Sequence, residues 1–133
     1  MKYFLDTNIC IFYMERSSMT IREKLRSIPA SNIALPTMTI AELLFGALNS
    51  ARKDYNLARY GLFISQYDSY GFDAAAAEAH ASIRDGLKRN GCQIGSNDMI
   101  IASTVIANRG ILVTNNTNEF SRIPGLNIED WSI

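Results

Sequence analysis

The stretch that decides the fold is MKYFLDTN, residues 1–8, in which a short apolar run stops at a carboxylate. Residues Tyr3 to Leu5 predict a buried β-strand, and Asp6 follows directly at its carboxyl end. The clearest other strand pattern is Ile111 to Val113, which ends in Thr114. We expect these two strands to be central neighbours in a parallel sheet. Ligands bind such sheets in the crevice at the carboxyl ends of the strands, which is where Asp6 falls.

Helical patterns fill the gaps between the strand patterns. We expect strands near residues 3–5, 33–35, 70–72, 111–114 and 127–131, and helices near residues 9–16, 21–27, 39–50, 55–67, 73–90 and 96–109. Strands separated by helices require right-handed crossovers. The predicted fold is therefore α/β, a three-layer α/β/α sandwich around a central, mostly parallel sheet of about five strands. With 133 residues and no repeat or linker, we expect one domain, residues 1–133.

Composition narrows the class of protein further. No run of eighteen apolar residues exists to cross a membrane, and the N-terminus lacks the pattern of a secretory signal, so we expect a cytoplasmic protein without a membrane partner. The chain has one histidine and two cysteines, without CxxC spacing. This argues against a His-rich zinc site and a Ser-His-Asp triad. Any metal here must rely on oxygen ligands, which favours Mg²⁺ or Mn²⁺.

The balance of charge at first argues against a nucleic-acid partner. Thirteen basic and thirteen acidic residues give a formal net charge of zero, whereas nucleic-acid-binding proteins usually present a basic surface. If four acids are metal ligands, nine acids remain against the thirteen bases, and the remaining surface is mildly basic. Several basic residues could hold RNA phosphates, although a solvated helix face is the better explanation for any one of them taken alone: Arg22, Lys24, Arg26, Arg52, Lys53 and Arg59.

Four acids are the candidates for a metal site: Asp6, Glu42, Asp98 and Glu119. Each has a simpler explanation when taken alone. Asp6 could cap the next helix, Glu42 fits the third position of a capping box opened by Thr39, Asp98 lies near a helix start capped by Ser96, and Glu119 falls in a loop. Their coincidence is what favours a site.

All four acids lie at a strand end or a helix start, and in a parallel α/β fold these positions meet on one rim. Carboxylates gathered there repel one another unless a cation neutralises them. A divalent ion held by carboxylates can activate water and stabilise the displacement of a phosphodiester. The sequence alone therefore favours metal-dependent phosphoryl chemistry at this rim.

The chain resembles the PIN-domain ribonucleases and, within them, the VapC toxins of bacterial toxin–antitoxin pairs. The resemblance runs almost from end to end and rests on the order and spacing of several short segments. These are Phe4 to Asn8, Ala41 to Leu43 with Gly46-Ala47, Ile94 to Asp98 with Ile101-Ala102, Val113 to Asn116, Glu119-Phe120, Ile123 to Leu126, and Glu129 to Trp131.

The resemblance implies an endoribonuclease that depends on Mg²⁺ or Mn²⁺ and has a carboxylate-ringed site. The family's first three acids match Asp6, Glu42 and Asp98. Many PIN domains carry a fourth acid where this chain has Asn116. Here Glu119 is expected to supply that charge while Asn116 contributes a hydrogen bond. Supporting contacts would come from residues next to the acids, namely Thr7, Asn8 and Thr114.

The same resemblance implies partners. Such toxins cut structured RNA, often tRNA, pair with a VapB-like antitoxin, and form homodimers that assemble with the antitoxin into higher hetero-oligomers. Several apolar residues could line a groove for an antitoxin helix, although core packing explains most of them: Phe12, Tyr13, Leu44, Phe45, Leu57, Tyr60 and Phe63.

Two other functions compete with this interpretation. A phosphorylatable receiver domain also places an acid at a strand end, but it needs paired early acids and a late lysine. Here Asp6 is alone, and Asn115-Asn116 stands where that lysine is required. A catalytically idle PIN-like module that only binds RNA or protein is the second alternative. The complete set of Asp6, Glu42 and Asp98 argues against it, and Asn116 argues mildly for it.

Overall fold

The computed structural model describes residues 1–133. The elements follow one another as β1 (Tyr3–Leu5), α1 (Thr7–Met14), α2 (Met19–Ser27), η1 (Ala30–Asn32), β2 (Ile33–Pro36), α3 (Thr37–Leu48), α4 (Lys53–Ile64), β3 (Asp68–Tyr70), α5 (Ala74–Arg89), α6 (Ser96–Ala107), β4 (Ile111–Val113), α7 (Thr117–Phe120) and β5 (Asn127–Glu129). Five strands form one sheet in the order β3-β2-β1-β4-β5. No helix has both the length and the apolar character that crossing a membrane requires.

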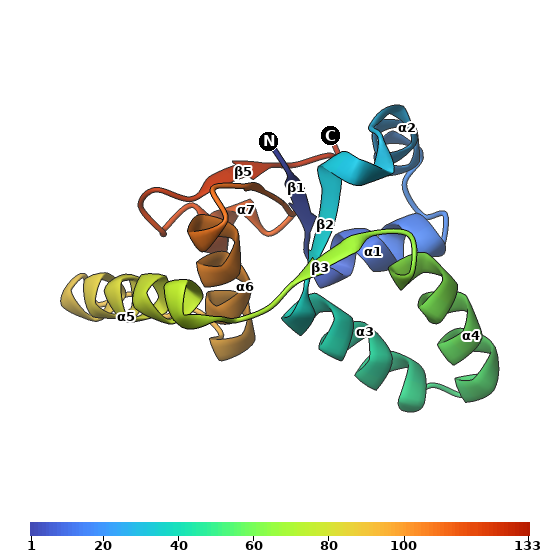
Figure 1. Ribbon diagram of the computed structural model, residues 1–133, viewed down its shortest axis with the longest axis horizontal. Helices are drawn as coiled ribbons and strands as arrows, with labels where there is room; N and C mark the ends of the chain where they lie inside the picture. Colours follow the sequence, from blue (N-terminus) through green and yellow to red (C-terminus); the bar gives the residue numbers. More distant parts are fainter.

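Every strand pair in the sheet is parallel, and β1 lies at its centre between β2 and β4. Helices α1 to α4 lie on one side of the sheet, and α5 and α6 lie on the other (Figure 1). The predicted three-layer α/β/α architecture is confirmed, and the sheet is wholly parallel. The predicted pairing of β1 with β4 is also confirmed, with Leu5 opposite Val113.

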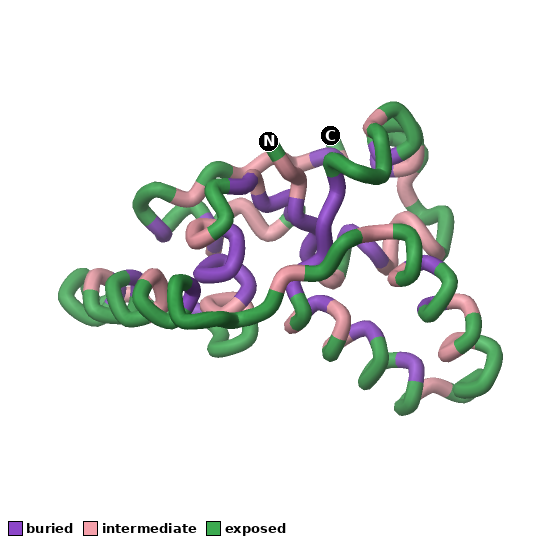
Figure 2. Tube along the Cα trace, in the orientation of Figure 1, coloured by how far each residue is buried: buried purple, intermediate pink, exposed green.

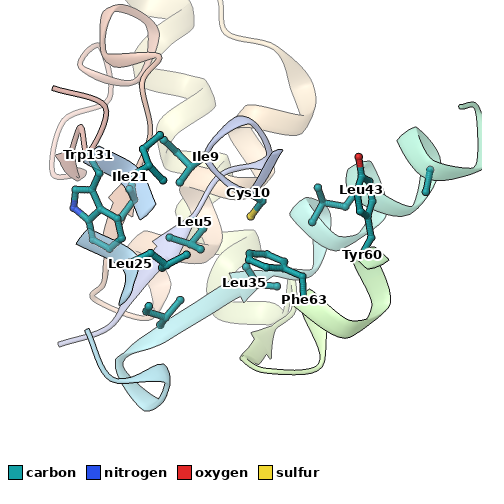
Figure 3. Packing of buried hydrophobic residues seen from close by; sticks show 13 residues of the cluster. Leu5, Ile9, Cys10, Ile21, Leu25, Leu35, Leu43, Tyr60, Phe63 and Trp131 are labelled. Atoms are coloured by element: carbon teal, nitrogen blue, oxygen red, sulfur yellow. The ribbon is translucent and has the colours of Figure 1, made fainter. Parts of the chain in front are cut away.

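Alternation along the strands builds a separate core on each face. In β1, Leu5 enters the core beneath α1 to α4, whereas Phe4 enters the core beneath α5 and α6. Figure 3 shows Leu5 and Leu35 in the middle of the first core, with Trp131 at one end and Tyr60 at the other. The buried backbone in Figure 2 follows the central strands and α6. This packing fixes the strand ends that carry the site.

One glycine is required by the close approach of the chain to Phe4. A Cβ atom at Gly110 would overlap the Phe4 ring and would lie 3.1 Å from the Lys2 carbonyl oxygen. Phe4 is completely buried in the second core, so its ring has little space to move away. Gly110 therefore lets the chain enter β4 directly beside β1.

Two predicted helix caps are wrong. Helix α3 begins at Thr37, directly after Pro36, so Thr39 lies inside the helix and does not cap it. Its buried hydroxyl instead donates a 3.0 Å hydrogen bond to the carbonyl oxygen of Leu5. Helix α6 has Gly95 at its cap position, and Ser96 makes no capping hydrogen bond. The capping-box explanation of Glu42 is therefore removed.

Two other differences concern short elements. The third strand is Asp68–Tyr70 and not residues 70–72, because its pairing with β2 sets Asp68 opposite Ala34 at a mostly exposed edge. Glu119 does not lie in a loop, since Thr117–Phe120 forms the short helix α7. Sequence patterns are weak at both places, because neither segment buries a long apolar face.

Candidate active site

The carboxyl ends of the strands open onto a small cavity of about 140 Å³. Helices α1, α3 and α6 all begin at this rim, which brings together residues that are far apart in the sequence. The cavity is lined by Asp6, Thr7, Asn8, Glu42, Asp98, Asn116 and Phe120. Three of the predicted acids and Asn116 therefore meet, and Glu119 reaches the same cluster through Asn116.

Asp6 is almost fully buried at the end of β1, with 6% of its surface exposed. Its Oδ1 accepts a 3.0 Å hydrogen bond from the Ile9 N–H, so it does cap α1. The pKa of Asp6 is raised to about 6: burial is the largest cause, the charges of Glu42 and Asp130 add to it, and hydrogen bonds from Thr114 and Ile9 oppose it. Asp6 thus caps a helix and also presents a costly charge to the rim.

Glu42 lies in the second turn of α3 and is held by two other helices. The Thr7 hydroxyl on α1 donates a 2.5 Å hydrogen bond to Glu42 Oε1. The Asn97 side-chain amide on α6 donates a 3.4 Å hydrogen bond to Oε2. Both oxygens of the carboxylate are therefore oriented by neighbours, which fixes its position at the rim.

Asp98 and Glu119 form the opposite corner. The pKa of Asp98 is raised to about 7: burial is the largest cause, and the adjoining Glu119, then Glu42 and Asp6, add to it. Glu119 Oε1 accepts a 3.0 Å hydrogen bond from the Gly95 N–H, and Oε2 accepts a 2.6 Å hydrogen bond from the Asn116 amide. The Asn116 amide thus orients the Glu119 carboxylate.

The structure adds three residues that sequence reasoning did not assign to the site. Gly95 supplies a backbone N–H to Glu119, Asn97 supplies an amide to Glu42, and Asp130 adds negative charge near Asp6. Asp130 follows β5 directly, so its place at a strand end was a usable signal. The other two act through contacts between distant segments, for which the sequence has no pattern.

Two of the basic residues expected to flank the site have other partners. Arg22 lies over the Tyr13 ring and donates a 3.5 Å hydrogen bond to the Tyr13 carbonyl oxygen. Arg59 donates a 3.3 Å hydrogen bond to the Met14 carbonyl oxygen. Both hold the last turn of α1 at Tyr13 and Met14, about 9–10 Å along the helix from its first residue at the rim. They stabilise the helix end there.

The rim offers only oxygen donors, the ligand chemistry that Mg²⁺ and Mn²⁺ prefer. Burial is the main cause of the raised pKa values of Asp6 and Asp98, and neighbouring carboxylates add to both. In this arrangement no three of the carboxylates converge around one point, because Glu42 and Glu119 are turned towards hydrogen-bond donors of the chain. The donor set fits a divalent cation in its chemistry.

Comparisons with known proteins agree with this geometry. The PIN domain family matches residues 3–126. The tRNA(fMet)-specific endonuclease VapC of Shigella flexneri is 39% identical over 132 residues, 99% of each chain. Ribonuclease VapC2 of Rickettsia felis is 36% identical over 132 residues, 98% of each chain. In the DNA-bound VapBC structure from Salmonella typhimurium, the matching chain has a TM-score of 0.92 and 38% identity, with 98% of both chains covered.

Proposed function

Because this chain belongs to the PIN-domain family, and within it to the VapC ribonucleases, we propose that it is the toxin of a toxin–antitoxin pair and an endoribonuclease that requires Mg²⁺ or Mn²⁺. The observation that carries the proposal is the cluster of Asp6, Glu42 and Asp98 around one cavity. The carboxyl ends of parallel strands are where such folds bind their ligands.

Asp6, Glu42, Asp98 and Glu119 would hold the metal ion. When bound, the ion would supply a Lewis acid that stabilises charge on the scissile phosphate and lowers the pKa of attacking water. Contacts within the chain keep two of these carboxylates in place. Thr7 and Asn97 orient Glu42, while the Gly95 N–H and Asn116 orient Glu119. Such support is what metal ligands need to act in a fixed geometry.

The cost of the site favours an enzyme over an idle binding module. Asp6 is 6% exposed and Asp98 is half-buried, yet both face other carboxylates. Burying like charges together is unfavourable unless a cation compensates them. A surface that only bound RNA, itself an anion, would gain nothing from acids at this place. Asn116 stands where many PIN domains have a fourth acid. Glu119, whose carboxylate is oriented by Asn116, supplies that charge instead.

Structured RNA is the proposed substrate, and tRNA is the first class to test. Two relatives are named for their action on tRNA(fMet), at 39% and 38% identity over nearly the whole chain. Initiator tRNA is therefore the proposed target within that class. The proposed location is the cytoplasm, where the proposed tRNA substrates are found.

The proposed protein partners are a VapB-like antitoxin and a second copy of the chain, which together form a higher hetero-oligomer. An exposed apolar surface on α3 and α4 supports this proposal: Leu44, Phe45, Leu48, Tyr55 and Leu62. Figure 2 shows that only the inner face of this hairpin is buried. Tyr60 and Phe63, which could have lined the groove, belong to the core.

The direct test is to incubate the purified chain with deacylated total tRNA and sequence the RNA ends. With Mg²⁺ we expect cleavage at one position of one or a few tRNAs, initiator tRNA among them. The same reaction with EDTA should leave all tRNA intact. Cleavage that is equally fast in EDTA would contradict the proposed requirement for a metal ion. No cleavage of tRNA or other cellular RNA with either ion would contradict the proposed activity.

A further inference from the structure

A second cavity, of about 500 Å³, is lined in part by the segment that leads into α6. This volume is within the range of about 300–1,000 Å³ that is typical of small-molecule sites. Its walls come from the C-terminal half of α5, the connection between α5 and α6, and the first turn of α6. The main contributors are Arg84, Leu87, Lys88, Cys92, Ile94 and Met99.

The cavity has a cationic side and an apolar side. Arg84 and Lys88 are one helical turn apart, so they lie on the same face of α5. Neither forms an ion pair, whereas the neighbouring Arg89 is paired with Asp85 at 3.1 Å. No carboxylate lines the cavity. Two unpaired cations beside an apolar wall suit a ligand that combines an anionic group with a flat apolar ring.

The cavity shares its wall with the carboxylate site. Met99, which lines the cavity, directly follows Asp98. Ile94, on the same wall, directly precedes Gly95, whose N–H holds Glu119. Arg122 donates a 3.3 Å hydrogen bond to the Gln93 carbonyl oxygen and joins this wall to the residues after α7. The linings of the two sites therefore include residues that are next to each other in the chain, with Cα atoms about 3.8 Å apart.

We propose that this cavity binds a nucleotide of the RNA substrate next to the scissile bond, its phosphate on Arg84 and Lys88 and its base against the apolar wall. The proposal rests on the ribonuclease function proposed above and adds a specificity subsite to it. Bases of single-stranded RNA bind proteins by stacking and by hydrogen bonds to their edges. Gln93 is among the residues that line the cavity, and its side-chain amide has both donors and an acceptor for such an edge.

Cys92 offers a measurement of occupancy that does not depend on cleavage. Cys92 lines the cavity and is partly exposed, whereas Cys10, the other cysteine, is completely buried. The rate at which N-ethylmaleimide alkylates the folded chain therefore reports on Cys92 alone. We expect a ribonucleoside 5′-monophosphate, tested in EDTA with each of the four bases, to slow this alkylation at least threefold. Inorganic phosphate at the same concentration should protect much less.

Matched variants of one helix test the contacts. Lys88→Ala and Arg89→Ala each remove one exposed cation from the last turn of α5, but only Lys88 lines the cavity. Because Lys88→Ala loses a hydrogen bond to a charged group, it should lower the affinity for the protecting nucleotide about tenfold. In Arg89→Ala, the nucleotide should protect Cys92 as well as it does in the wild type. With RNA, Lys88→Ala should raise KM and leave kcat unchanged.

Three results would overturn the proposal. Either no nucleotide protects Cys92, or inorganic phosphate protects it as well as nucleotides do. The third is that nucleotides protect Cys92 equally well in Lys88→Ala and in Arg89→Ala. These outcomes are separate from those of the ribonuclease test. Protection by nucleotides in a chain that cuts no RNA would support the subsite and contradict the activity. Cleavage of RNA without protection would support the activity and contradict the subsite.

Discussion

The Thr7 hydroxyl donates a 2.5 Å hydrogen bond to Oε1 of Glu42, thirty-five positions along the chain. This contact joins the first turn of α1 to α3 at the rim of the sheet. It leaves the Glu42 carboxylate with a fixed direction, which the Asn97 amide supports from the other side. Glu42 is thus a candidate ligand whose position depends on a neighbour that carries no charge.

Replacing Thr7 with valine should therefore lower metal-dependent cleavage by about 10- to 100-fold, the usual effect of losing a group that orients a metal ligand. Thr7→Ser keeps the hydroxyl and should restore most of the activity. Titration of Mg²⁺ in cleavage assays of both variants would show the valine variant requiring more metal. Equal Mg²⁺ requirements in the two variants would show that the hydroxyl does not position Glu42.

The pH dependence of stability follows from the raised pKa values of Asp6, to about 6, and Asp98, to about 7. Both are above the ordinary value of 3.8, so the folded chain binds protons more tightly than the unfolded chain. The free energy of unfolding must then fall as pH rises from about 4 to above 7. In EDTA, we expect a higher Tm at pH 5 than at pH 8, measured by differential scanning calorimetry.

Adding Mg²⁺ should raise the Tm at pH 8, because the ion binds the ionised folded state, and should have little effect at pH 5. Asp98→Asn should reduce the difference in Tm between the two pH values in EDTA. A Tm that does not change between pH 5 and pH 8 in the wild type would contradict the raised pKa values that burial and neighbouring carboxylates give Asp6 and Asp98.

The corner formed by Asn116 and Glu119 can be tested by comparing two variants. Glu119→Gln removes the charge that we assign to the metal site and should abolish detectable cleavage. Asn116→Ala removes only the amide that orients Glu119 Oε2 at 2.6 Å, and should lower cleavage by about 10- to 100-fold. Cleavage rates in saturating Mg²⁺ measure both effects. A greater loss in Asn116→Ala than in Glu119→Gln would reverse this assignment.

The close contact of Gly110 with Phe4 gives a prediction about stability. Gly110→Ala should lower the free energy of unfolding by about 1–3 kcal/mol, because the new methyl group overpacks a buried ring. At Gly86, inside α5, a new methyl group would have no neighbouring atom within 4 Å, so Gly86→Ala should stabilise by about 0.5–1 kcal/mol. Urea denaturation measures both. A neutral Gly110→Ala variant would mean that the ring can shift freely.

Much of the fold could be predicted because its decisive signals are local. The strands at Tyr3–Leu5 and Ile111–Val113 are short apolar runs bounded by polar residues, and their side chains are buried on both faces. The helix predicted at residues 73–90 is α5, and Asp73 caps it by accepting a hydrogen bond from the Ala76 N–H. The predicted position of the edge strand β3 was two residues too late in the chain, because half-exposed polar segments carry no such pattern.

The candidate site could be predicted as a set of acids, but its supporting contacts could not. Strand ends and helix starts are visible in the sequence, so the meeting of Asp6, Glu42 and Asp98 could be expected. Thr39 looked like a helix cap, yet its hydroxyl bonds Leu5 across the sheet. Asn97 reaches Glu42 across 55 positions. Such pairings depend on how layers pack, and no local pattern records them.

The measurement that tests the central claim most directly compares the rate of tRNA cleavage by Asp98→Asn with that by Asp85→Asn, which serves as the control. Asp98 faces the other acids at the rim, whereas Asp85 is exposed on α5 and paired with Arg89. We expect Asp98→Asn to lose detectable cleavage in Mg²⁺ while its Tm in EDTA stays at or above that of the wild type, and Asp85→Asn to cleave normally. Cleavage by Asp98→Asn at the wild-type rate would contradict the carboxylate site.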